Sequence, residues 1–158
     1  GSGPAGLECA LQLANRGYRV TLAEAGKELG GRITKECQLP GLASYVRVRD
    51  YRTNLLRQKH NVEIYLDSEL DKAAILEFEF QHVFLATGAR WRRDGTGRFF
   101  HQPVPGLETI PTFTPEDLIG EKSNLGHVLI FDDDHYYMGS VIAEALVAQG
   151  VEVCFVTP

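Results

Sequence analysis

The chain has 158 residues, of which 44% are hydrophobic, and its formal net charge at pH 7 is −5. This length suffices for one globular domain or two small lobes, and the sequence has no uncharged apolar run long enough to span a membrane. The acidic balance argues against a nucleic-acid binder because no basic stripe compensates it.

The cysteine pattern indicates the redox setting. Cys9, Cys37 and Cys154 stand far apart and form no CxxC pair. This spacing favours a reducing, cytoplasmic location and speaks against a redox disulfide, a zinc site or a cluster ligated by this segment. No signal or transit peptide is recognisable.

Helical and strand patterns alternate along the first half of the chain. Apolar residues recur at helical spacing after Pro4, and Gly17 ends that run. The expected elements, in chain order, are a helix over 4–16, a strand over 18–25, a helix over 46–60, a strand over 62–66, a segment over 73–80 that fits either helix or strand, and a strand over 82–88.

The second half repeats this alternation after a long loop. Prolines and glycines between residues 90 and 124 predict a crossover, followed by a strand over 126–131, a helix over 138–149 and a strand over 151–156. The sequence therefore predicts an α/β, Rossmann-like FAD/NAD(P)-binding fold with a parallel, doubly wound sheet. We expect an FAD/ADP-binding half over 1–90, a crossover over 91–124 and the start of a second, degenerate NAD(P)-type lobe over 125–158.

The chain opens on GSGPAG, a glycine pattern typical of a phosphate-binding turn. Gly1 would allow a tight turn, Gly3 a close approach of the backbone to a pyrophosphate, and Gly6 close packing of the helix on the sheet. The helix N-terminus that follows would offer free N–H groups to phosphates, and Pro4 suits its first turn. A tight turn that only begins a helix would carry the same glycines.

Glu24 ends the next expected strand. Its separation from the glycine turn is close to the roughly 20 residues at which a ribose-binding acid follows such a turn. A carboxylate there accepts hydrogen bonds from a ribose 2′-hydroxyl and repels a 2′-phosphate, which favours FAD, NAD or ADP over NADP. A solvated acid at a strand end would look the same in the sequence.

Two further short motifs point toward the same ligand. Gly30-Gly31-Arg32 could bring backbone close to a nucleotide and place an arginine near phosphate charge, although an ordinary turn with a surface arginine also fits. Ala86-Thr87-Gly88 closes a strand with small residues, where larger side chains would block a nucleotide, or simply marks a buried strand with a bend.

Taken together, the motifs of this chain resemble the C-terminal region of the trimethylamine dehydrogenase-like flavoproteins. The resemblance rests on GSGPAG, Glu24, ELGGR and LATGA, and on the longer stretches LATGARWRRDGTG, VPGL, QLPGLASYVRVRDYR and FDDDHYYMGSVIAEALVAQGVEV. The resemblance extends over nearly the whole chain. Wider relatives of that family include 2,4-dienoyl-CoA reductase. Family members carry FMN and a 4Fe–4S cluster in an N-terminal (β/α)8 barrel, which is absent from this sequence.

The resemblance implies an adenine-nucleotide site, holding ADP or FAD, on particular residues of this chain. The pyrophosphate contacts would be Gly1, Ser2, Gly3, Pro4, Ala5 and Gly6, the ribose contact Glu24, the adenine backbone contact Leu70, and the further contacts Ala25, Gly31, Arg32, Ala86, Thr87 and Gly88. No catalytic residue is implied here, because the substrate site belongs to the barrel.

The turn after the strand at 126–131 differs from a dinucleotide site. Asp132, Asp133 and Asp134 stand where phosphates would lie, and each carboxylate–phosphate pair costs about 3 kcal/mol at about 5 Å and an effective dielectric of about 20. We therefore expect no NAD(P) in this lobe. Capping of the next helix by Asp133 or Asp134 accounts for the acids better than a divalent cation, because adjacent turn residues rarely converge on one ion.

Other polar residues give weaker signals. Arg90, Arg92 and Arg93 around Trp91 could shape a nucleotide edge or a partner surface, or simply form a solvated basic loop. His60, His82, His101 and His127 lack partners at triad spacing, so we assign them no catalysis.

Because a phosphate-binding turn normally follows a strand, we expect the chain to be a piece of a longer protein whose first strand is missing. The expected function is adenine-nucleotide binding within an iron–sulfur flavoprotein amine dehydrogenase or N-demethylase that passes electrons to a protein such as an electron-transfer flavoprotein. The isolated piece should be inactive, and the protein could form a homo-oligomer. The alternatives are a fragment of an NADH-dependent dienoyl-CoA reductase-type enzyme and a non-catalytic module with a vestigial nucleotide site.

Overall fold

The structure, a computed structural model, describes residues 1–120 and 124–157. The chain divides into two compact units, one made of Gly1–Cys37 with Ser44–Ala89 and the other of Gln38–Ala43 with Arg90–Pro158. Residues 121–123 of the predicted crossover and residue 158 of the predicted second lobe lie outside the described residues. Among the described residues, each unit contains one parallel strand pair.

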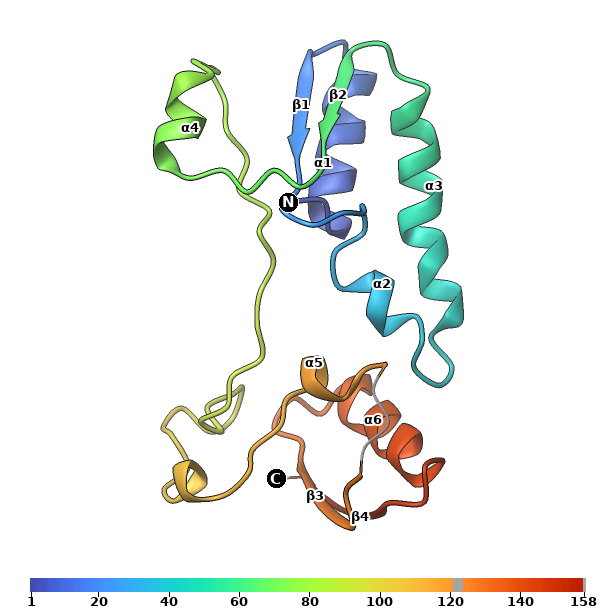
Figure 1. Ribbon diagram of the computed structural model, residues 1–158, viewed down its shortest axis with the longest axis vertical. Helices are drawn as coiled ribbons and strands as arrows, with labels where there is room; N and C mark the ends of the chain where they lie inside the picture. Colours follow the sequence, from blue (N-terminus) through green and yellow to red (C-terminus); the bar gives the residue numbers. More distant parts are fainter. Residues whose placement is uncertain (121–123, 158) are drawn as a thin grey trace. The chain divides into compact units, whose positions relative to one another are not determined.

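The first unit is built on strands β1 (Val20–Ala23) and β2 (Val62–Tyr65), which pair in parallel with Val20 opposite Val62. Helix α1 (Pro4–Asn15) precedes β1 and helix α3 (Val46–Arg57) precedes β2, and the two helices pack against each other beside the strands (Figure 1). Parallel neighbours need such a crossover connection because the chain must return to the same end of the sheet.

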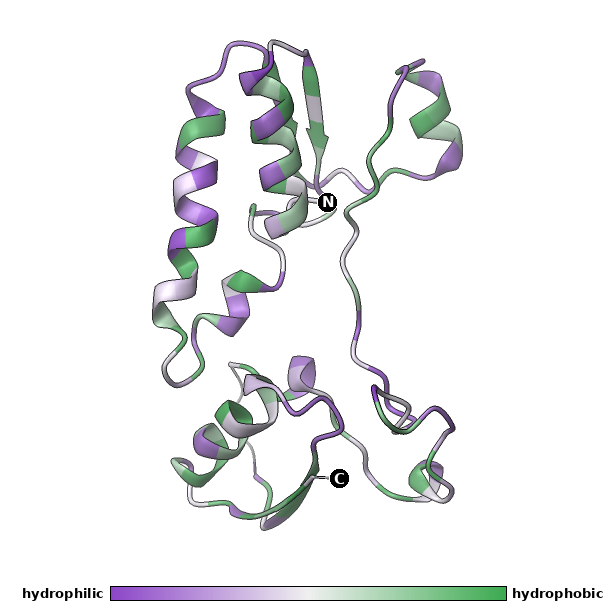
Figure 2. Cartoon of the chain, turned by 180° about the vertical axis from the view of Figure 1, so that it is seen from behind, coloured by the Kyte–Doolittle hydropathy of each residue, from purple (hydrophilic) through white to green (hydrophobic). Residues whose placement is uncertain are grey.

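The apolar spacing noted in the sequence explains the core of this unit. One face of α1 is buried, and it meets apolar residues of β1, α3 and the loop after β1; the cluster comprises Leu7, Ala10, Leu11, Leu22, Leu29 and Leu56. Figure 2 shows polar and apolar bands alternating along α1 and α3, as expected of helices with one face against a core.

Shorter elements complete the first unit. Helix α2 (Ile33–Glu36) follows the Gly30-Gly31 turn, and a 3₁₀ turn, η1 (Ala43–Tyr45), leads into α3. The segment that fitted either helix or strand forms helix α4 (Lys72–Glu77), because the Asp71 carboxylate caps it by accepting the Ala74 N–H at 2.8 Å.

The second unit repeats the strand–helix–strand pattern. Strands β3 (His127–Phe131) and β4 (Glu152–Val156) pair in parallel, with His127 opposite Glu152, and helix α6 (Tyr137–Val147) connects them. Met138, Ile142 and Leu146 bury the inner face of α6. The loop before β3 contains a 3₁₀ turn, η2 (Leu107–Thr109), and helix α5 (Pro115–Leu118).

The α/β class, the parallel pairing and the Rossmann-like character expected from the sequence are confirmed, whereas one predicted strand is wrong. Residues 82–88 run without strand pairing. Val83, Phe84 and Leu85 are mostly exposed, at 51%, 60% and 78%. Apolar β-formers favour a strand only where a neighbouring strand accepts their backbone hydrogen bonds, and that neighbour cannot be read from local sequence.

Within the described ranges, no helix has the length and apolar character needed to cross a bilayer.

Candidate functional site

The glycine turn at residues 1–6 is held tightly by its surroundings at two of its three glycines. A Cβ on Gly6 would collide with the carbonyl oxygen of Gly1, and a Cβ on Gly1 would collide with the carbonyl oxygen of Ala86. Packing therefore requires glycine at both positions, whereas the sequence pattern predicts a tight turn at Gly1 and packing of the helix on the sheet at Gly6.

Gly3 differs from the other two glycines because nothing lies within 4 Å of the position that its Cβ would take. Its backbone angles, φ −64° and ψ −179°, are open to any residue, so neither packing nor conformation demands glycine. Gly3 is also the N-cap of α1, and no side chain caps that helix. The helix N-terminus and the bare Gly3 thus leave room for a phosphate to approach backbone N–H groups.

Glu24 stands at the end of β1, directly beside the glycine turn. Its Oε2 accepts both the N–H and the hydroxyl of Ser2, each at 2.7 Å, and its Oε1 accepts the Gly26 N–H at 2.8 Å. Burial raises the pKa of this carboxyl group, but the hydrogen bonds from Gly26 and Ser2 outweigh burial and leave the pKa below its ordinary value. The group is therefore ionised at neutral pH.

The Gly30-Gly31 turn lies against the first turn. The Gly30 N–H donates to the Ser2 carbonyl oxygen at 2.9 Å, and a Cβ on Gly31 would lie 2.9 Å from the Gly3 Cα. Gly31 also has a φ of +56°, which favours glycine. The two glycine turns, far apart in sequence, are neighbours because both are short of side chains.

Arg32 follows these glycines, and its guanidinium group pairs with Glu36, with Nε 2.7 Å from Oε1. A phosphate contact, as predicted from the sequence, would have to share the guanidinium with this buried carboxylate.

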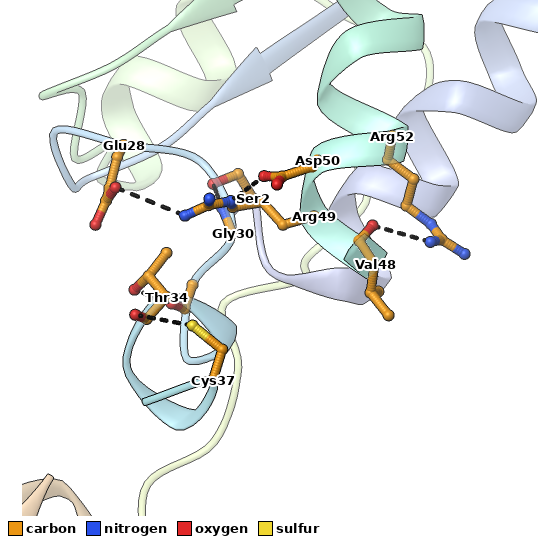
Figure 3. A network of polar contacts seen from close by, with 10 residues as sticks. Ser2, Glu28, Gly30, Thr34, Cys37, Val48, Arg49, Asp50 and Arg52 are labelled. Atoms are coloured by element: carbon orange, nitrogen blue, oxygen red, sulfur yellow. Dashed lines mark hydrogen bonds and ion pairs between the residues drawn. The ribbon is translucent and has the colours of Figure 1, made fainter. Parts of the chain in front are cut away.

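Arg49 of α3 is a cation near the turn that sequence reasoning missed. Its side-chain stem lies across Gly30, where an added Cβ would stand 2.5 Å from its Cδ, and its Nε bonds Asp50 at 2.8 Å (Figure 3). In the run VRVRDYR it looks like one of several arginines on a charged helix face, so only the packing distinguishes it.

The remaining predicted contacts border these turns to different degrees. A Cβ added at Gly1 or Gly6 would lie 2.3 or 3.3 Å from half-buried Ala86, and exposed Thr87 and Gly88 follow that residue. Ala25 is exposed next to Glu24. The Ser68 N–H donates to the Glu24 carbonyl oxygen at 2.8 Å, which fixes the segment after β2 beside β1, and half-buried Leu70 follows two residues later.

The acidic turn before α6 has a different structure. Asp132 and Asp133 are buried, and Asp132 Oδ1 accepts the N–H groups of Asp134 and His135 at 3.2 and 3.3 Å. The carboxylate of Asp133 accepts the N–H group of Phe99 at 2.8 Å and that of Phe100 at 3.2 Å.

The predicted capping of α6 by Asp133 or Asp134 is therefore wrong. The N-cap of that helix is Tyr136, without a side-chain hydrogen bond, because Asp133 faces the 97–100 loop instead. In the described part of the chain, no group of three or more histidine, cysteine or acidic side chains is arranged to hold a metal ion.

Arg92 and Arg93, in the basic loop around Trp91, bond residues of their own unit. Arg92 pairs with Asp94, and Arg93 donates to Asp117 at 2.6 Å and to the Thr112 carbonyl oxygen at 2.8 Å. These pairs account for both arginines as local supports of the loop.

Three features together define a Rossmann-like nucleotide-binding region. They are a glycine turn at an uncapped helix N-terminus, a following strand that ends in an ionised acid, and a second glycine turn beside the first. Consistently, the family model described as an NAD(P)-binding Rossmann-like domain matches residues 1–67.

Comparison with known proteins narrows the class. The chain is 34% identical to dimethylamine dehydrogenase of Hyphomicrobium sp. (strain x), over 99% of this chain and 22% of that protein. Two solved structures superpose on it with TM-scores of 0.94. Histamine dehydrogenase from Rhizobium sp. 4-9 is 47% identical over 99% of this chain and 23% of its own. The 6-hydroxypseudooxynicotine amine oxidase of Pseudomonas geniculata N1 is 46% identical over 99% and 24%.

These similarities confirm the resemblance to the trimethylamine dehydrogenase-like flavoproteins that the sequence motifs indicate. The chain spans 22–24% of the length of the relatives described above.

Proposed function

We propose that the first unit binds the adenosine diphosphate portion of a nucleotide, either ADP itself or FAD. The observation that carries this proposal is the open space at Gly3, a position where neither packing nor backbone conformation calls for glycine. A pyrophosphate close to the backbone at this point would supply the missing reason for glycine.

The residues that would hold the nucleotide are the ones gathered around Gly3. The glycine turn over residues 1–6, which leads into α1, would bind the pyrophosphate, and ionised Glu24 would accept a ribose hydroxyl. An ionised carboxylate at the ribose disfavours a 2′-phosphate, which supports ADP or FAD over NADP. Ala25, Gly31, Arg32, Leu70, Ala86, Thr87 and Gly88 would border the same ligand.

We further propose that the whole protein is an iron–sulfur flavoprotein that oxidises an amine. Support comes from the names of its relatives, two of which are dehydrogenases of dimethylamine and histamine. In this proposal a barrel domain carries FMN, the 4Fe–4S cluster and the amine site, and the present chain supplies the adjoining nucleotide-binding region over 1–90 with the second lobe over 125–158. When bound, FMN would accept the electrons of the amine.

The electron acceptor in this proposal is another protein, such as an electron-transfer flavoprotein, rather than a nicotinamide. The second turn supports this choice, because the backbone N–H groups of Asp134 and His135 already donate to Asp132. We place the protein in the cytoplasm, where Cys9, Cys37 and Cys154 would stay free as they are here.

Nucleotide release from the full-length protein tests the proposal. Acid denaturation and chromatography should yield one adenine nucleotide per chain in addition to FMN, and its identity decides between ADP and FAD. The variant Gly3→Ala should lower that occupancy, or the affinity for added ADP, by roughly tenfold or more, because its methyl group would stand between the backbone and the pyrophosphate.

Gly126→Ala is the matched control. Gly126 also has open space around its missing Cβ and no left-handed backbone requirement, but it lies before β3 in the other unit. Full adenine-nucleotide occupancy in Gly3→Ala, or a wild-type protein that releases no adenine nucleotide, would contradict the proposal.

A further inference from the structure

Ser2 lies at the centre of the candidate site in the first unit, and none of its atoms is exposed. Its relative exposure is 0%, and all three of its polar groups have partners within the unit. The N–H and hydroxyl donate to Glu24 Oε2, the hydroxyl oxygen accepts the Gly30 N–H at 3.4 Å, and the carbonyl oxygen accepts the same N–H at 2.9 Å. Figure 3 shows Ser2 next to Gly30. A residue bound in this way has no group left for a phosphate.

These contacts determine how Glu24 can meet a ligand. A carboxylate offers about four acceptor directions, two on each oxygen. Ser2 takes both directions of Oε2, while Gly26 takes one direction of Oε1. One direction on Oε1 is left for a hydroxyl group of a bound nucleotide. The Ser2 hydroxyl thus fixes which oxygen of Glu24 serves the ligand.

We infer that Ser2 is a positioning residue that orients the Glu24 carboxylate toward the ribose of the adenine nucleotide and so sets the preference for a free 2′-hydroxyl. This inference rests on the proposed adenine-nucleotide function. It assigns Ser2 a different role from the pyrophosphate contact expected from its place in GSGPAG. Ser2 acts through Glu24, and its hydroxyl also ties the first glycine turn to Gly30.

The test compares ADP with 2′-deoxy-ADP on the full-length protein after release of bound nucleotide, using titration calorimetry. Wild type should bind ADP roughly tenfold more tightly, the value of one hydrogen bond to a charged acceptor. Ser2→Ala removes the hydroxyl but keeps the N–H bond to Glu24. The preference for ADP should then fall to within roughly threefold, since the carboxylate is held by one bond fewer.

Ser68→Ala is the matched control. Ser68 belongs to the same unit, and its N–H bonds the backbone of Glu24, but its hydroxyl donates to the Leu66 carbonyl oxygen at 2.8 Å. This variant should keep the wild-type ratio. A purely structural role of Ser2 would weaken both ligands equally and leave the ratio unchanged, so an unchanged ratio in Ser2→Ala overturns the inference.

The remaining outcomes separate this inference from the proposed function. Equal binding of the two ligands by wild type would overturn the role of Ser2 while leaving nucleotide binding intact, whereas binding of neither would overturn both. Should Ser2→Ala fail to fold, Ser2→Cys keeps the side chain near its present volume and replaces the hydroxyl with a weak donor. A wild-type ratio in Ser2→Cys would then count against the inference.

Discussion

Single carboxylates decide what the turn before α1 and the turn before α6 can hold. In the first unit Glu24 takes hydrogen bonds from Ser2 and Gly26 and leaves the N-terminus of α1 uncapped. In the second unit Asp132 takes the N–H groups of its own turn, and Asp133 takes those of Phe99 and Phe100. A turn whose N–H groups already have an anionic partner has little to offer a phosphate.

The same residue-scale chemistry makes the second unit sensitive to acid at Asp117. The Thr114 N–H, the Arg93 guanidinium and the Thr114 hydroxyl lower the pKa of this carboxyl group to about 2. Because the folded pKa lies below the unfolded value of about 3.9, ionised Asp117 stabilises the fold fully above about pH 5. That contribution is lost as the pH falls from about 4 through about 2.

Unfolding experiments on wild type and Asp117→Asn check this expectation. The difference in the free energy of unfolding should be constant above about pH 5 and shrink steadily below about pH 4. Titration of the Asp117 carboxyl carbon by NMR gives the pKa directly. A midpoint near the ordinary value of an aspartate would contradict the contacts with Thr114 and Arg93.

At the scale of elements, helix periodicity was enough to predict the framework of the first unit. Leu7, Ala10 and Leu11 share one buried face of α1, and both strands that pair in this unit occur where alternation places them. The strand predicted over residues 82–88 is wrong because pairing depends on a neighbouring strand. The predicted capping by Asp133 is wrong because its partners, Phe99 and Phe100, are more than thirty positions away in the sequence.

The candidate site could be predicted in its turns but not in its side-chain partners. The glycine spacing and Glu24 are local signals, and the structure brings them together. The side-chain partners depend on how separate segments pack. The contacts concerned are those of Ser2 with Glu24, of Arg32 with Glu36 and of Arg49 with Gly30. Such contacts leave no trace in a single sequence.

The packing of α3 against α1 gives a prediction at this scale. Leu56 of α3 is 1% exposed within the core cluster of the first unit. Leu56→Ala should lower the free energy of unfolding by about 2–5 kcal/mol through lost burial and a cavity. Urea denaturation followed by circular dichroism measures this change.

Leu76→Ala in α4 is the control, because Leu76 is 64% exposed and its truncation should change stability by less than about 0.5 kcal/mol. Equal effects of the two substitutions would mean that the α1–α3 interface is not the core of this unit.

For the whole molecule, the two units have the same strand–helix–strand plan but different turns. The first turn has open space at Gly3, whereas buried acids of the second turn pack against Gly139 and Gly97. A Cβ on Gly139 would lie 2.9 Å from the Asp132 side chain, and a Cβ on Gly97 would collide with the Asp133 carboxylate. A shared fold can therefore carry one nucleotide site rather than two.

This contrast predicts which reductant the proposed full-length flavoprotein accepts. Anaerobic addition of NADH or NADPH should leave the flavin absorbance unchanged, because a dinucleotide in the second unit would have to displace Asp132 from its own turn and place phosphates next to three aspartates. Each uncompensated carboxylate–phosphate pair at about 5 Å costs about 3 kcal/mol, or more than a hundredfold in affinity. An amine substrate of the proposed enzyme should bleach the flavin under the same conditions. The variant Asp133→Asn removes one charge but keeps an acceptor for Phe99 and Phe100, so it should remain unreactive toward NADH.

Rapid bleaching of the wild-type flavin by NADH would refute the assignment of a protein electron acceptor and would favour a reductase of the dienoyl-CoA type.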